Sequence, residues 1–198
     1  MPKIVNHSEY KEEILKDCFD LFARKGFGEV TMREIAKELK ISTGTLYHYF
    51  PTKESIFREM IKYLSEKKVL QFAERVPKTS SVEERIQSMF QYIVNNESFF
   101  QNVLFLIIDY YRQNGFQDPE NFIRETINYF KSSITEQIGL QDQVLVNVVF
   151  SYILGLITHQ LIRSGLESKE EEVDMFRKMI EIFSLSSEGT SQSGGKII

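Results

Sequence analysis

The sequence predicts an all-α protein of about nine helices. Apolar residues recur at helical spacing along nearly the whole chain, as in Leu15, Cys18, Phe19 and Phe22. Capping boxes, in which a Ser or Thr precedes a Glu by three residues, mark helix starts at Thr31, Ser81 and Ser168. The apolar run at residues 103–108 fits a buried strand by composition, but no partner strand accompanies it. We therefore expect a helix there too.

The first fifty residues predict three helices in close succession. The first ends at Gly26, the second begins after Thr31, and Ser42 caps the third. Pro51 ends the third helix, because proline disfavours helical backbone at the residue before it. Thr52 is a cap for a long fourth helix that reaches about residue 72.

Longer helices fill the rest of the chain. We expect them at about residues 82–94, 99–114, 119–138, 142–165 and 168–183, with Asp118 and Pro119 at the start of the third of these. From residue 184 the composition shifts to Ser, Gly, Gln and Thr, which is typical of a disordered tail. The predicted domains are a small three-helix domain at 1–51, a larger helical domain at 52–185 and a tail at 186–198.

Charge and cysteine content limit the possible classes of protein. The formal net charge is −4, yet residues 1–60 balance at zero and no acidic residue lies between Leu39 and Lys53. The chain has one cysteine, Cys18, which we interpret as a small buried hydrophobic residue. We recognise neither a signal peptide nor a run of about eighteen uncharged apolar residues, so we expect a cytoplasmic protein without a membrane span.

Residues 31–57 contain the most informative pattern. Two short helices joined by about four residues are the geometry of a helix-turn-helix unit, in which the second helix enters the major groove of DNA. Small Ala36 lets the helices cross closely, and Ile41 fills the space between them. We expect DNA contacts from Thr31, Arg33, Ser42, Thr43, Gly44, Thr45, Tyr47, His48, Tyr49 and Lys53.

At these residues the sequence resembles the tetracycline-repressor (TetR) family. The matching residues are Thr31, Ile35-Ala36, the run from Ile41 to Tyr47, Tyr49-Phe50 and Lys53-Glu54. One departure is Lys40, at a turn position where many members carry glycine. A positive φ there would cost a lysine on the order of 1 kcal/mol.

The resemblance implies a homodimer that binds a duplex DNA operator and is released by a small molecule. The last two long helices would pair with those of a second copy, and the middle helices would enclose the effector. Because the middle helices are rich in aromatic and aliphatic residues, we expect an apolar effector. The candidate pocket residues are Phe72, Met89, Phe90, Phe100, Leu104, Ile108, Tyr111, Phe122 and Phe130, and each of them fits a packed core equally well.

Two other classes of function stay open at this point. Catalysis is disfavoured because His7, His48 and His159 lie far apart without metal-ligand spacing, and no nucleophile turn or phosphate loop is in register. A helical bundle that binds only other proteins is the second alternative. We expect neither a cofactor nor an enzyme, and a repressor rather than an activator.

Overall fold

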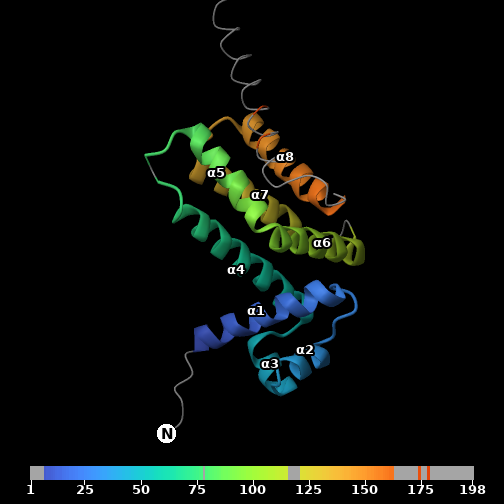
Figure 1. The fold of residues 1–198 in the computed structure, drawn as a ribbon. Coiled ribbons are helices and arrows are strands. Elements are labelled where there is room, and N and C mark those ends of the chain that lie inside the picture. Colours follow the sequence, from blue (N-terminus) through green and yellow to red (C-terminus); the bar gives the residue numbers. More distant parts are fainter. Residues whose placement is uncertain (1–6, 78, 116–120, 163–173, 175–177, 179–198) are drawn as a thin grey trace, which may run out of the picture. The chain divides into compact units, whose positions relative to one another are not determined.

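The computed structural model describes residues 7–77, 79–115, 121–162, 174 and 178, and within them it is all-helical (Figure 1). The helices are α1 (His7–Lys25), α2 (Met32–Glu38), α3 (Thr43–Tyr49), α4 (Lys53–Ala73), α5 (Val82–Asn95), α6 (Glu97–Asn114), α7 (Phe122–Ile138) and α8 (Gln143–Ile162). The all-α prediction is confirmed, with eight helices in the described part of the chain. The predicted helix at 168–183, its capping box and the tail fall almost entirely outside the described residues, as do Asp118 and Pro119.

Contacts divide the chain into two units. The first holds Met1–Glu74 and Ser98–Ser132, and the second holds Arg75–Glu97 and Ser133–Ile198. The first unit therefore contains α1 to α4, α6 and most of α7, and the second contains α5, the end of α7 and α8.

The predicted caps at Thr31, Thr52 and Ser81 all precede helices. Thr31 and Ser81 form reciprocal capping boxes with Glu34 and Glu84, as their spacing predicts. Thr52 forms a box of the same kind with Ser55, whose hydroxyl is hydrogen-bonded at the helix start. Each box satisfies two of the backbone N–H groups that a helix start leaves without partners.

The turn between α2 and α3 requires a left-handed residue, and that residue is Lys40. Its φ is +55°. The Lys40 N–H donates to the Lys37 carbonyl at 3.2 Å, and the Ile41 N–H donates to the Ala36 carbonyl at 3.0 Å. These two bonds form a Schellman motif, which usually places glycine at the left-handed position. Lysine pays a steric penalty there, as the sequence comparison with the family pattern suggested.

Aromatic rings form the centre of the first unit's core. Phe57 of α4 stacks on Tyr110 of α6 at 5.0 Å, and Phe27, from the turn after α1, contacts both rings. Phe122 of α7 lies 5.4 Å from Tyr110. Ring contacts of this kind stabilise beyond the apolar area that they bury. The three N-terminal helices α1 to α3 are held on the same core as α4 and α6.

Cys18 is fully buried in this core, in agreement with the sequence interpretation. Burial raises the pKa of its thiol to about 12, and the nearby Asp17 carboxylate adds to this effect. Because the thiolate is the reactive form, Cys18 is a structural residue with low nucleophilicity.

The second unit contains the most apolar helix of the described chain, α8. Its twenty residues include no charged side chain, and by length and composition the helix is able to cross a membrane. This finding corrects the expectation that no such stretch exists; apolar core helices of soluble proteins meet the same criterion. Val146, Val149 and Leu156 are buried, whereas Val144 and Leu145 are exposed. The exposed side chains leave α8 with apolar surface beyond that used inside the unit.

Candidate nucleic-acid interface

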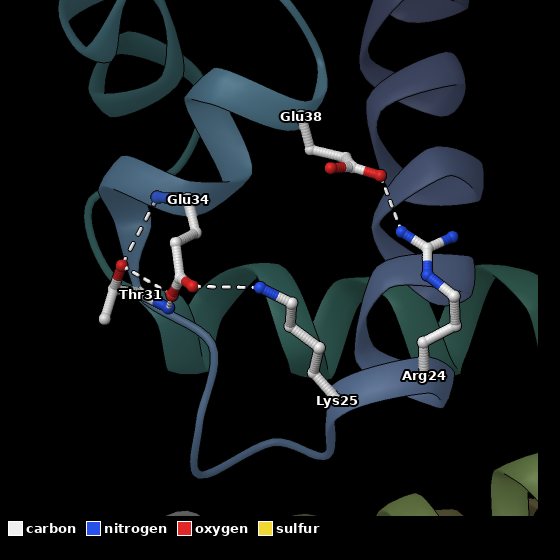
Figure 2. Close-up of polar contacts among 5 residues, drawn as sticks. All are labelled: Arg24, Lys25, Thr31, Glu34 and Glu38. Carbon is white, nitrogen blue, oxygen red and sulfur yellow. Dashed lines mark hydrogen bonds and ion pairs between the residues drawn. The ribbon is translucent and has the colours of Figure 1, made fainter.

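The helix α2 is fastened to α1 by two ion pairs that bracket its length (Figure 2). Arg24 donates to Glu38 at 2.5 Å, and Lys25 donates to Glu34 at 3.0 Å. Ile35 and Ala36 are the buried residues of α2. The buried apolar face and the two ion pairs therefore fix the position of α2 on α1.

The Glu34 carboxylate both pairs with α1 and takes part in the capping box at the start of α2. It accepts hydrogen bonds from Lys25 and from both the hydroxyl and the N–H of Thr31 (Figure 2). These donors, Lys25 foremost, lower the pKa of Glu34 below its usual value. The carboxylate is therefore ionised at neutral pH and supports the start of α2.

The helix α3 is anchored from one side and open on the other. Ser42 caps it, accepting a hydrogen bond from the Thr45 N–H at 2.9 Å. Leu46 and Phe50 are completely buried. The opposite side carries exposed residues, including Thr43, Gly44, Tyr47 and His48, with Tyr47 52% exposed. We call these four residues the α3 face. It offers hydroxyls, an imidazole and a gap at Gly44, the small polar chemistry that reads base edges.

An aromatic cluster borders the α3 face. Tyr49 lies half-buried with its ring 4.4 Å from that of His7 and 5.5 Å from that of Tyr10. His48 lies 5.8 Å from His7. The contact brings the start of α1 beside the end of α3. Sequence reasoning missed His7 and Tyr10, because only the crossing of two helices places them there.

Lys53 is already engaged within the chain. Its ammonium donates to the Phe27 carbonyl at 2.8 Å and to the Gly28 carbonyl at 3.4 Å, and lies 4.3 Å from the centre of the Phe27 ring. The sequence predicts that this residue contacts DNA. In the structure it links the first turn of α4 to the turn before α2. An ammonium has three N–H donors, so one remains for a contact with DNA.

Asp109 of α6 holds the same turn from another helix. Its carboxylate accepts a hydrogen bond from the Gly28 N–H at 3.2 Å. A Cβ built at Gly26 would lie 3.0 Å from that carboxylate, and one at Gly28 would collide with the Gln113 side chain. Asp109 is therefore a residue that positions the turn, and only the tertiary structure reveals it.

The nine candidate effector residues are divided between the two units. Met89 and Phe90 belong to the second unit, and the other seven belong to the first. Phe72, Met89, Phe90 and Phe122 are buried, whereas Ile108 and Tyr111 are exposed. Two pockets in the described part of the first unit include candidates among their lining residues. Ile108 lines the smaller one, of about 210 Å³, Phe122 lines the larger one, of about 690 Å³, and the remaining candidates line neither.

The N-terminal helices are similar to those of known proteins. Residues 14–60 match the model of bacterial regulatory proteins of the tetR family. The chain is 42% identical over 59 residues to the uncharacterized HTH-type transcriptional regulator YuxN of Bacillus subtilis, covering 30% of this chain and 20% of that protein. It is 35% identical over 52 residues to the biofilm-operon negative transcriptional regulator IcaR of Staphylococcus aureus, covering 26% and 28%. The chain thus spans less than a third of the length of these two curated relatives.

The fold extends beyond the matched segment. A protein of Saccharomonospora viridis, solved in complex with choline, aligns with a TM-score of 0.66 at 17% identity, covering 88% of this chain and 97% of that one. At this identity the alignment shows a shared fold. Residues 14–60 are therefore similar to the N-terminal segment of bacterial regulatory proteins of the tetR family, and the chain shares the fold of the Saccharomonospora viridis protein.

Proposed function

We propose that this protein is a transcriptional repressor that binds duplex DNA as a homodimer and is released by a small molecule. The observation that carries the proposal is the α3 face, a solvent-exposed set of small polar and aromatic groups on a helix whose other side is buried. In a helix-turn-helix unit that face enters the major groove. The negative regulator IcaR, similar over 52 residues, supports repression as the direction of control.

The predicted DNA contacts form two groups under this proposal. Thr43, Gly44, Tyr47 and His48 are available for base edges. Thr31, Arg33, Ser42, Thr45, Tyr49 and Lys53 serve mainly to place the domain on the phosphate backbone or to hold its own geometry. Phosphate contacts position a protein on DNA, whereas base contacts determine the sequence that it prefers.

The homodimer is supported by the apolar surface of α8. Val144, Leu145, Val148 and Leu154 are exposed on a helix that carries no charge. Burying them against a second copy would remove this surface from water. A dimer would also present two α3 faces, which then read two half-sites of a near-palindrome.

The experiment is a selection from a pool of random duplexes, followed by a gel shift with the enriched sequence. We expect an enriched near-palindrome whose half-sites lie about one or two helical turns apart. Light scattering should give twice the chain mass of 23.2 kDa. The absence of any enriched duplex would contradict DNA recognition, and a strict monomer at micromolar concentration would contradict the dimer.

The small-molecule release is tested on the same complex. An effector that prefers the DNA-free state should weaken operator binding about 5- to 150-fold, the usual range of allosteric coupling. The binding of choline by the Saccharomonospora viridis protein supports a ligand-binding role for this fold. We propose a cytoplasmic regulator without catalytic activity. If no compound in a broad panel of acyl chains, aromatics and cations changes the gel shift, the protein is a constitutive DNA binder.

A further inference from the structure

The peptide group between Phe27 and Gly28 is held at both ends by side chains of opposite charge. Its carbonyl, which belongs to Phe27, accepts a hydrogen bond from the Lys53 ammonium at 2.8 Å. Its N–H, which belongs to Gly28, donates to the Asp109 carboxylate at 3.2 Å. Lys53 lies in the first turn of α4, and Asp109 lies on α6. One peptide therefore bridges a cation and an anion that come from two different helices of the first unit.

The turn that carries this peptide brings its backbone close to α6. Gly26 has a φ of +83°, which glycine adopts without a steric penalty. A Cβ on Gly26 would lie 3.0 Å from the Asp109 carboxylate, so glycine also leaves room for that carboxylate beside the turn. The Phe27 side chain is buried, and its ring contacts those of Phe57 and Tyr110. These contacts hold the peptide with its N–H toward α6 and its carbonyl toward α4.

The two hydrogen bonds strengthen each other through the peptide. Each involves a charged group, and hydrogen bonds of that kind are roughly twice as strong as those between neutral groups. An N–H that donates to an anion makes the carbonyl of the same peptide a better acceptor, so hydrogen bonds in such a chain are cooperative. Both bonds are partly buried, and water therefore screens them less than it would at an exposed surface. Asp109 thus contributes to the position of the Lys53 ammonium through the intervening peptide.

We propose that Asp109 is a positioning residue for DNA binding that acts on Lys53 through the Phe27–Gly28 peptide. The inference rests on the proposed function, in which the Lys53 ammonium contacts a phosphate of DNA. Because two carbonyls of the turn hold the ammonium, its remaining N–H has a fixed direction before DNA arrives. A group that is already oriented loses less conformational freedom on binding than a mobile one. The bridge also ends on α6, so a displacement of this helix would reach a residue that contacts DNA.

A double-mutant cycle on operator affinity tests the proposal, with the selected duplex at one salt concentration. Asp109→Ala removes the acceptor of the Gly28 N–H and should weaken operator binding about fivefold. The sign of this effect is informative, because the loss of a negative charge by itself strengthens binding to a polyanion. In the Lys53→Met background, Asp109→Ala should no longer weaken binding, since the side chain through which it acts is absent.

Two further variants distinguish positioning from a general loss of structure or a change of net charge. Asp109→Asn keeps a side-chain oxygen that accepts from the Gly28 N–H, so it should restore most of the affinity that Asp109→Ala loses. Asp20→Ala removes an exposed carboxylate of α1 and should not weaken operator binding. Unchanged or increased affinity of Asp109→Ala would overturn the proposal, as would equal weakening with and without the Lys53 ammonium.

Hydrogen exchange in the free protein tests the bridge without DNA. The Gly28 amide should exchange about tenfold faster in Asp109→Ala than in the unsubstituted protein. Lys53→Met should also accelerate this exchange, although the ammonium contacts only carbonyls of the turn. Unchanged exchange of the Gly28 amide in either variant would overturn the bridge. If the selection enriches no duplex, the proposed function fails, whereas operator binding with an additive cycle would contradict only the role of Asp109.

Discussion

The two seven-residue helices of the helix-turn-helix unit are held in opposite ways. α2 has two buried residues, two ion pairs to α1 and a reciprocal capping box. α3 has one buried residue, Leu46, a single serine cap and an exposed face. α2, which is fixed by several contacts, therefore positions α3, whose polar face must remain exposed to bind DNA. A reading surface needs unpaired polar groups, and those groups cannot also hold the helix in place.

The largest effect should come from truncating Leu46, the buried residue within α3. Leu46→Ala should reduce the free energy of unfolding by about 3 kcal/mol, because it removes a fully buried side chain and leaves a cavity. Chemical denaturation monitored by circular dichroism measures this change. A loss below about 1 kcal/mol would mean that α3 is held by contacts other than Leu46.

The next effect concerns Lys53, which begins the helix after α3. Lys53→Met keeps the apolar stem and removes the ammonium from the Phe27 and Gly28 carbonyls. We expect a loss of about 1 kcal/mol in unfolding free energy. If the ammonium also contacts a phosphate, as we propose, the slope of log affinity against log salt should fall by about one.

The matched control for Lys53 is Lys62, an exposed residue that donates to no carbonyl within the described part of the chain. Lys62→Met should change neither the free energy of unfolding nor the salt slope. A lowered stability with an unchanged salt slope would restrict Lys53 to its structural role.

The turn that joins α2 to α3 offers a substitution of opposite sign. Lys40→Gly should raise the free energy of unfolding by about 1 kcal/mol, because glycine adopts the φ of +55° without a steric penalty. Lys37→Gly, inside α2, should lower it by about 1 kcal/mol. Effects of the same sign in the two variants would contradict the left-handed turn.

The smallest effect should be the pH dependence of the stability that the Glu34 contacts give to α2. The folded pKa of Glu34 is lowered, so its stabilising contribution is present above the unfolded pKa of about 4.3 and is lost as pH falls through the folded pKa. Glu34→Gln should therefore lower the melting temperature at pH 7 and converge with the unsubstituted protein near pH 3. A constant difference across this range would exclude Glu34 ionisation as the cause.

Local chemistry was predictable from the sequence, and contacts between distant segments were not. The capping boxes at Thr31 and Ser81 and the strained turn at Lys40 depend on residues within five positions of one another. The hydrogen bond between Asp109 and Gly28 joins residues 81 positions apart, and no periodicity in the sequence predicts it.

Candidate site residues follow the same division. The exposure of the α3 face follows from helical spacing around Leu46, which the sequence shows directly. The engagement of Lys53 and the contact of His7 with Tyr49 arise only when helices cross. Apolar residues in the middle helices could not be divided into core and pocket, because both environments select the same side chains.

The central claim is that the α3 face reads DNA sequence while α2 only positions it. The most direct measurement is the ratio of affinities for the selected operator and for an unrelated duplex, at one salt concentration. Replacing both Thr43 and Tyr47 by alanine should lower this ratio about 10- to 100-fold with an unchanged melting temperature. Arg24→Ala, which breaks an α2 tie, should leave the ratio unchanged. An unchanged ratio in the α3 variant would contradict the account.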